Sequence, residues 1–154
     1  MQLERTYDFG QVARLNRTVH QLHVDLYPDI FKPYDEHATA QFFQQLMDKE
    51  HYVFYLAMVE KRVVGYVWVE FKSQPETLFK QASRSLYIHQ LSLEPAEQGK
   101  GHGKRIMKQL EDSARERNLP VIELDYWVNN EGAAAFYEKC GFKKQREFVY
   151  KQVE

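Results

Sequence analysis

The sequence has only one cysteine, Cys140, and no long run of apolar residues. One cysteine excludes an intramolecular disulfide framework and cannot by itself form a structural zinc site, so the chain fits a reducing compartment. A membrane-spanning helix needs about 18 consecutive apolar residues, and none occurs. The first five residues also lack the basic and apolar segments of a secretory signal. We therefore expect a cytoplasmic protein that is neither exported nor inserted in a membrane.

The chain also lacks an excess of charge of either sign. Its 21 Lys and Arg against 22 Asp and Glu give a formal charge of -1, which leaves no electrostatic footprint for nucleic acid or an anionic membrane. Internal repeats and linkers rich in proline, glycine and serine are missing, so the length predicts one domain over residues 1–154. A content of 44% apolar residues is enough to form its core.

Apolar spacing predicts an α/β protein with a mixed β-sheet flanked by helices. Asp8 is a plausible N-cap for the first helix, and Pro28 and Pro33 separate that helix from the second. Glu60-Lys61-Arg62 joins two strands without the Gly or Asn that a tight hairpin usually has. In the order βαα, ββ, βα, βα, β, we expect helices over 9–26, 36–49, 104–117 and 131–139, strands over 52–59, 63–71, 86–93, 121–128 and 148–153, and a loop over 72–84.

The most informative segment runs from Gln98 to Arg105 and places three alternating glycines between a strand and a helix. A helix start offers unpaired N–H groups and partial positive charge, and glycine lets a phosphate approach the backbone, so a diphosphate is the expected ligand. The spacing fits neither a Walker loop nor a dinucleotide-binding loop. A tight turn without a ligand is the alternative.

Two motifs carry a family resemblance. The first, Gln98-x-x-Gly101-x-Gly103, is similar to the Q/R-x-x-G-x-G/A signature of the GCN5-related N-acetyltransferase (GNAT) superfamily. The second, from Asn130 to Phe142, is similar to the family pattern N-x-x-A-x-x-F-Y-E-K-x-G-F and follows about 30 residues later. Together they cover residues 86–142, whereas the N-terminal third resembles the family only in its element order.

The resemblance implies a single GNAT-like domain whose two central parallel strands splay apart. It implies transfer of an acetyl group from acetyl-CoA directly to a primary amine, either of a small molecule or of a protein or peptide. Gln98 stands where the family more often has Arg, so Lys100, Lys104 or Arg105 could supply phosphate attraction instead. The implied acetyl-CoA-binding residues are Leu91, Leu93, Gln98, Gly99, Lys100, Gly101, His102, Gly103, Lys104 and Asn130, the last of which could also be a helix N-cap.

Tyr137 matches the family tyrosine that protonates the departing thiolate. A phenol with a pKa near 10 can act as such an acid, although core packing beside Phe136 is the simpler interpretation of its position. Cys140 lies one helical turn later. We expect it to be inert, because the family needs no acyl-enzyme and a nucleophilic cysteine needs a base nearby.

His89 is the leading candidate for the general base that an attacking amine needs. It falls where many family members have Glu, on a strand that has no acid until Glu94. An imidazole titrates near neutral pH and can accept the proton. Glu70 and Asp125 are the alternatives, and a structural strand histidine is the plain interpretation.

The stretch around residues 20–31 mixes acids with aromatic rings and corresponds to the acceptor wall of the family. Asp25, Tyr27, Asp29 and Phe31 could bind a cationic amine by charge and ring contact, or could form an ordinary acidic surface. His20 and His23 have a metal-compatible spacing without a third ligand, so we expect no metal.

Two other classes of function compete with an enzyme. A regulatory module could bind CoA without turnover, and Gln98 and the missing strand carboxylate favour it. A nucleic-acid adaptor using the cations between Lys100 and Lys108 is disfavoured by the net charge. A homodimer is a common assembly for such chains.

Overall fold

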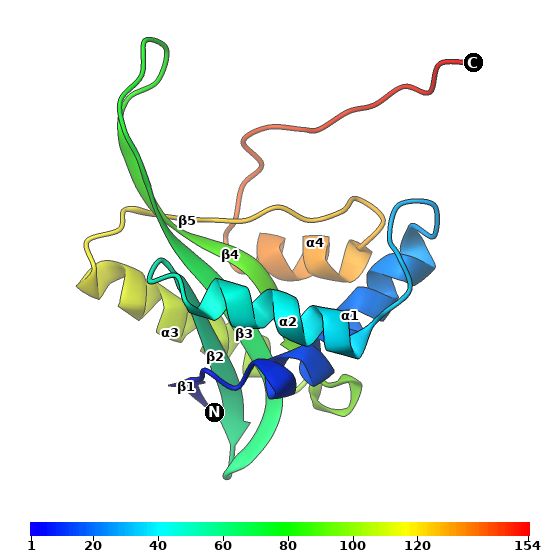
Figure 1. Ribbon diagram of the computed structural model, residues 1–154. Helices are drawn as coiled ribbons and strands as arrows, with labels where there is room; N and C mark the ends of the chain where they lie inside the picture. The colour runs from blue at the N-terminus through cyan, green and yellow to red at the C-terminus, as the bar shows by residue number, and fades with distance from the viewer.

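The computed structural model describes residues 1–154 as a five-stranded sheet with helices on both faces (Figure 1). The expected order of elements is confirmed from the first strand to the fourth helix. The elements are β1 (Gln2–Arg5), α1 (Phe9–Leu26), α2 (Glu36–Met47), β2 (Tyr52–Val59), β3 (Arg62–Gln74), β4 (Ser83–Leu93), a short 3-10 turn (Pro95–Glu97), α3 (His102–Glu116), β5 (Val121–Glu123) and α4 (Glu131–Lys139).

The strands lie in the order β1-β2-β3-β4-β5, antiparallel except for the parallel pair β4 and β5. The mixed sheet is therefore as expected. Side chains alternate between its faces with the period of two that strands impose. Val67 and Val69 of β3 belong to the cluster under α3, while Tyr66 and Trp68, which alternate with them, pack on the α1 and α2 side.

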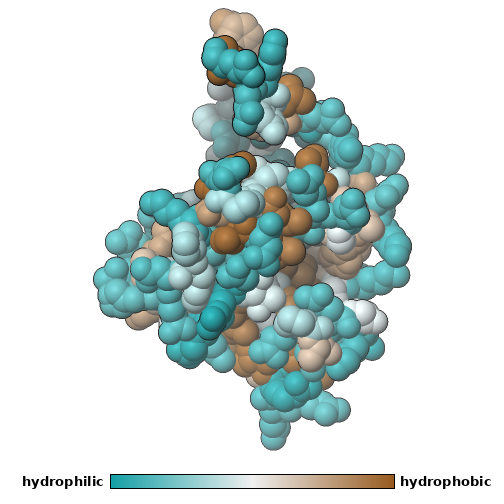
Figure 2. Space-filling model, turned by 90° about the vertical axis from the view of Figure 1, so that its right-hand side faces the viewer, coloured by the Kyte–Doolittle hydropathy of each residue, from teal (hydrophilic) through white to brown (hydrophobic).

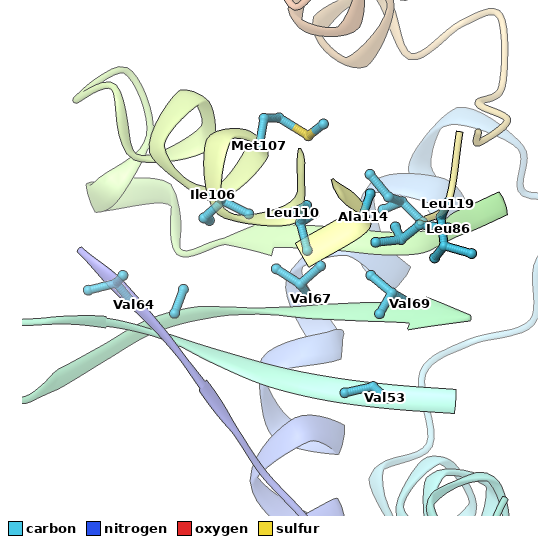
Figure 3. Packing of buried hydrophobic residues seen from close by; sticks show 12 residues of the cluster. Val53, Val64, Val67, Val69, Leu86, Ile106, Met107, Leu110, Ala114 and Leu119 are labelled. Atoms are coloured by element: carbon cyan, nitrogen blue, oxygen red, sulfur yellow. The ribbon is translucent and has the colours of Figure 1, made fainter. Parts of the chain in front are cut away.

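Two hydrophobic clusters hold the layers together. The larger joins the sheet to α3 and includes Val64, Val67, Leu86, Ile106 and Leu110 (Figure 3). The smaller joins the opposite face to α1 and α2. Full burial of each such aliphatic side chain contributes about 1.5–3 kcal/mol relative to exposure, so both faces of the sheet are anchored.

The turn between β2 and β3 has the backbone of a tight hairpin although its residues do not favour one. Glu60 and Lys61 both adopt positive φ, 48° and 65°, the backbone of a two-residue hairpin turn that twists as the strands do. Neither residue is Gly or Asn. The pairing of the two long strands on either side supplies the stabilisation that holds them in this region.

The expected loop over 72–84 is wrong at both ends, because β3 reaches Gln74 and β4 begins at Ser83. Lys72, Ser73 and Gln74 continue β3 and pair with Ser85, Arg84 and Ser83 of β4, so a long hairpin projects beyond the helices (Figure 1). The polar residues that suggested a loop occur because both faces of this extension are solvated. Leu78 and Phe79 at its tip are exposed.

Two strand predictions near the C-terminus are also wrong. The strand expected over 121–128 ends at Glu123, because the chain then diverges from β4. The closing strand expected over 148–153 is not formed, and residues 143–154 run away from the sheet (Figure 1). Strand-forming residues need a neighbouring strand to pair with, and the tail lies beside none. No helix is both long and apolar enough to cross a membrane.

Candidate active site

The sheet opens between β4 and β5. These strands pair only at Ser85–Val121, Leu86–Ile122 and Tyr87–Glu123, whereas β4 continues to Leu93 beside β3. The expected splay of the parallel strands is therefore confirmed. The edge of β4 after Tyr87 has no strand beside it. Leu91 and Leu93 lie on that open edge, and an extended ligand with amide groups could pair there as a strand would.

A loop with unpaired amides follows the open edge. None of the backbone N–H groups from Gly99 to Lys104 donates to a backbone carbonyl. Gly99 and Gly101 have φ of 75° and 79°, and a Cβ at either position would meet nothing within 4 Å. Left-handed backbone and open space together leave the N–H groups accessible at the start of α3, where the helix dipole favours an anion.

The third glycine has a different role. A Cβ on Gly103 would lie 2.8 Å from the ring of Phe136. Gly103 is therefore needed for the close approach of α4 to α3, and only Gly99 and Gly101 shape the loop.

A buried carboxylate holds the loop from below. Glu97 is 5% exposed, and its oxygens lie 3.0 Å from Arg62 Nη1, 3.3 Å from Lys100 Nζ and 3.4 Å from His102 Nε2. The hydrogen bond from Arg62 is the main cause that lowers the pKa of Glu97. Gln98 donates from its side-chain amide to the carbonyl of Leu93 at 3.1 Å. Lys100 and Gln98 thus support the loop from within the protein.

A basic groove lies beside the loop between α3 and α4. It has a volume of about 280 Å³. Lys104 and Lys108 come from α3 and Lys139 from α4. Lys108 pairs with Asp112 at 2.9 Å, so an anionic ligand in the groove would meet chiefly the ammonium groups of Lys104 and Lys139 beside the carboxylate of Glu111. The lining residues are Lys104, Met107, Lys108, Glu111, Lys139 and Cys140.

Tyr137 is half-buried on α4 and packs against the cluster under α3. Its ring lies 5.1 Å from that of Phe136 and 5.4 Å from that of Phe142. Burial raises the pKa of Tyr137 to about 12 and also raises the pKa of the Cys140 thiol. The phenol therefore keeps a proton to donate, and Cys140 stays a neutral thiol.

Asn130 caps the helix that carries Tyr137. Its side-chain oxygen accepts a hydrogen bond from Ala133 N at 3.1 Å, as an N-cap residue does. The N-cap interpretation of Asn130 is confirmed.

His89 and Glu70 form one pair. His89 Nε2 lies 2.6 Å from Glu70 Oε2 of the neighbouring strand. The register of β4 shifts here, because Ile88 and Gln90 pair with Val69 and Trp68 and leave His89 without an opposing residue. Such a bulge re-aims a side chain. The His89 ring stacks on Trp68 at 4.3 Å.

The surroundings of His89 and of Tyr137 lie on opposite faces of the sheet. Trp68 beside His89 packs on the α1 and α2 side, whereas Tyr137 packs on the α3 side. The gap between β4 and β5 lies between the two layers. Asp125, the other carboxylate expected as a candidate base, is exposed and accepts a hydrogen bond from the Tyr87 hydroxyl at 2.7 Å. Burial, followed by this bond, raises the pKa of Tyr87.

A buried polar network includes Gln90, the residue after His89, and was not predicted from the sequence. Asn16 Nδ2 donates to Tyr66 Oη at 2.8 Å and to Gln90 Oε1 at 2.9 Å, and Tyr66 also donates to Gln90. It fixes α1 against the part of β4 next to His89. A signal exists in the sequence, because Asn16 stands one turn after Val12 on the apolar face of its helix.

The four residues expected to bind the acceptor amine lie in two different environments. Tyr27 and Phe31 pack against Trp127, at ring distances of 4.8 and 5.1 Å, and Tyr27 Oη accepts from Asn129 N. Asp25 and Asp29 are exposed. The α1–α2 connection thus contacts the β5–α4 connection, and Trp127 is a member that sequence reasoning missed. From that side, hydrophobic side chains gather in the middle of a hydrophilic face (Figure 2).

Histidine and acid side chains gather nowhere into a group of three or more that could hold a metal ion. His20 Nε2 instead bonds the carbonyl of Lys32, and His23 stacks on Phe31 at 5.0 Å. Burial lowers the pKa of His23.

Known proteins resemble the chain in sequence and in fold. The uncharacterized N-acetyltransferase YycN of Bacillus subtilis is 28% identical over 94 residues, which are 61% of this chain and 56% of YycN. The chain thus spans about half the length of the curated relatives it matches.

Solved structures share the fold. A mutant of the BH1408 protein from Bacillus halodurans has a TM-score of 0.92 at 24% identity and covers all of both chains. A predicted acetyltransferase from Clostridium acetobutylicum, solved with acetyl-CoA, has a TM-score of 0.66 at 19% identity and covers 98% of this chain and 95% of its own. The model of the Acetyltransferase (GNAT) family matches residues 16–142. The chain therefore belongs to the GNAT acetyltransferase family.

Proposed function

We propose that the protein is an N-acetyltransferase that transfers an acetyl group directly from acetyl-CoA to a primary amine of a small molecule or of a protein or peptide. The observation that carries this proposal is the run of free amides from Gly99 to Lys104 at the end of the open strand edge. A structural neighbour solved with acetyl-CoA supports the choice of donor.

The donor would lie along the gap. The amides of Gly99 to Lys104 would bind its pyrophosphate, and the open edge at Leu91 and Leu93 would pair with the amides of its pantetheine arm. His102 and Gly103 contribute through their backbone, because the imidazole of the first faces Glu97 and the second is packed on Phe136. Since Glu97 pairs with Lys100, the groove lysines supply the remaining attraction for phosphate.

His89 would remove the proton of the amine, directly or through water. Glu70 holds the imidazole by one nitrogen, which leaves the other nitrogen to accept a proton. The amine nitrogen then attacks the thioester carbonyl, and the carbon–sulfur bond breaks as the tetrahedral intermediate collapses. Tyr137 would donate its proton to the departing thiolate, because its raised pKa keeps the phenol neutral at working pH.

The amine would enter beside the aromatic residues Tyr27, Phe31 and Trp127. Their ring faces attract an ammonium group, and the exposed Asp25 and Asp29 add negative charge at the entrance. A single cysteine fits a reducing setting, and we place the reaction in the cytoplasm.

Calorimetry with acetyl-CoA, followed by thiol release with a mixed panel of amines, tests the proposal. We expect binding and amine-dependent release of CoA. Binding without release for any amine would instead indicate the regulatory module. Cys140→Ser should retain turnover, because direct transfer needs no thiol; its inactivity would indicate an acyl-enzyme.

A further inference from the structure

We propose that the buried network of Asn16, Tyr66 and Gln90 positions the general base. Its hydrogen bonds decide which residue of β4 is the extra one in the bulge, and so aim His89 at Glu70. The inference rests on the role proposed for His89 in proton transfer. It adds three positioning residues that act through the imidazole and not on the substrate.

The apolar pattern of β4 requires one extra residue in the strand. Leu86 and Ile88 belong to the cluster under α3, and Leu91 and Leu93 pack against that same cluster. A strand alternates its side chains between two faces, so residues an odd number apart, such as Ile88 and Leu91, share a face only if a bulge adds one residue between them. The apolar pattern does not choose which of the two intervening residues is left without a partner.

The side chain of Gln90 makes that choice. Its oxygen accepts a hydrogen bond from Asn16 Nδ2 at 2.9 Å and another from the Tyr66 hydroxyl. These bonds hold Gln90 on the α1 and α2 side, where it pairs with Trp68 in the register. His89 is then the unpaired residue. Its ring lies on the same side of the sheet, stacked on Trp68 at 4.3 Å.

Burial makes the network demanding. Asn16 is 5% exposed and Tyr66 is fully buried. Both N–H groups of the Asn16 amide are used, one on Tyr66 Oη and one on Gln90. Burial raises the pKa of Tyr66, so its hydroxyl keeps the proton that it donates. If Gln90 moved to another register, both buried groups would keep a donor without an acceptor, which is costly.

A double-mutant cycle tests the positioning role by thiol release at saturating acetyl-CoA. Tyr66→Phe keeps the ring and removes the hydroxyl, so turnover should fall about tenfold while the KM for acetyl-CoA is unchanged. In a His89→Gln background the same substitution should change turnover less than about twofold, because no imidazole is left to aim. A further tenfold loss in that background would mean that the network does not act through His89, and the proposal would be wrong.

Tyr34→Phe is the matched control. Tyr34 donates from its hydroxyl to the carbonyl of Ala13 on α1, so the same substitution there removes a bond to α1 and none to β4. Its turnover should stay within about twofold of the parent. Asn16→Leu breaks the network from the side of α1 and should reproduce the loss seen in Tyr66→Phe. Circular dichroism checks that every variant remains folded.

A measurement without substrate separates this inference from the proposed function. Proton–nitrogen correlation spectra of the imidazoles report the tautomer and titration of His89, whose signals are those missing in His89→Gln. The titratable groups that face its ring are Glu70, Tyr52 and Tyr87, and all three are retained in Tyr66→Phe. In that variant we expect the His89 signals and their titration midpoint to move while those of the other histidines stay.

The two outcomes of the spectra are distinct from a failure of catalysis. His89 signals like those of the parent in both Tyr66→Phe and Asn16→Leu would overturn the positioning role even in an active enzyme. Moved signals in a protein that releases no CoA with any amine would support the positioning of His89 and overturn only the proposed function.

Discussion

Two carboxylates in this protein each lie beside a histidine, in different surroundings. Glu97 is buried under the loop and is shared by Arg62, Lys100 and His102. Glu70 faces the open end of β4 and forms its one close ion pair with His89. Its side chain is 18% exposed, against 6% for Glu97.

The different surroundings of Glu97 and Glu70 suit different roles. A carboxylate with three basic neighbours stays ionised and fixes the position of each, which suits a loop that must keep its amides aligned. A carboxylate with a single imidazole can orient that ring and still let it gain and lose a proton. We therefore propose that Glu97 positions the loop and that the His89–Glu70 pair transfers the proton.

His89→Gln should have the largest effect on turnover, because it removes the imidazole from the His89–Glu70 pair. Gln keeps a polar side chain but cannot titrate, so turnover should fall on the order of 10²-fold or more while the affinity for acetyl-CoA is unchanged. The rate of the parent should rise in two steps with pH, one from imidazole and one from the amine itself. The variant should lose the lower step in a thiol-release profile. A variant with the full profile of the parent would return His89 to a structural role.

Tyr137→Phe should lower turnover on the order of 10²-fold and leave acetyl-CoA binding nearly intact, because the hydroxyl acts only in the transition state. Since the pKa of Tyr137 is raised to about 12, the parent should show no loss of rate from this phenol below about pH 11, where an ordinary tyrosine is already ionised. Steady-state kinetics with saturating donor measure both. Equal turnover in variant and parent would limit Tyr137 to packing.

Gly101→Asp should weaken acetyl-CoA binding at least tenfold, which is about 1.4 kcal/mol, because it puts a negative charge where the pyrophosphate is expected. Gly101→Asn is the matched control. It has the same shape, tolerates positive φ and carries no charge, so it should bind more tightly than the Asp variant. Calorimetry measures both, and equal affinities would remove the diphosphate from this loop.

Glu97→Gln should have the smallest effect on chemistry. We expect a few-fold weaker binding of acetyl-CoA as the loop loses its support, with turnover at saturating donor unchanged, whereas Glu70→Gln should lower turnover. A loss of turnover in Glu97→Gln with Glu70→Gln unaffected would reverse the two assignments.

The pH dependence of thermal stability also tests the role of Glu97. The pKa of Glu97 is lowered from 4.5 in the folded state, so its ionised form stabilises the fold above the unfolded pKa, and that contribution is lost as the pH falls through the lowered value. The parent should melt at a higher temperature than Glu97→Gln at pH 7, and the difference should shrink in more acid solution. A difference that stays constant down to acid pH would show that the charge of Glu97 contributes nothing.

Sequence alone determined the helices over 9–26 and 131–139, the strand over 52–59 and the family, because these depend on local periodicity, caps and motif spacing. It also identified His89 and Glu70 but kept them as alternatives, since their strands are joined through a hairpin of unknown register. Only the tertiary structure decided that a bulge at His89 brings the two side chains within 2.6 Å.

The C-terminal segment and the β3–β4 hairpin show the same contrast between what local sequence favours and what tertiary structure decides. The residues over 148–153 have the composition of a strand, yet a strand exists only where another backbone supplies hydrogen bonds, and none lies beside them in this chain. Composition also suggested a loop over 72–84, whereas the pairing of β3 with β4 continues through both ends of that segment, at 72–74 and 83–84. Local sequence determines what a segment can become, and long-range pairing decides whether it does so, because the bonds that stabilise a sheet belong to residues far apart in the chain.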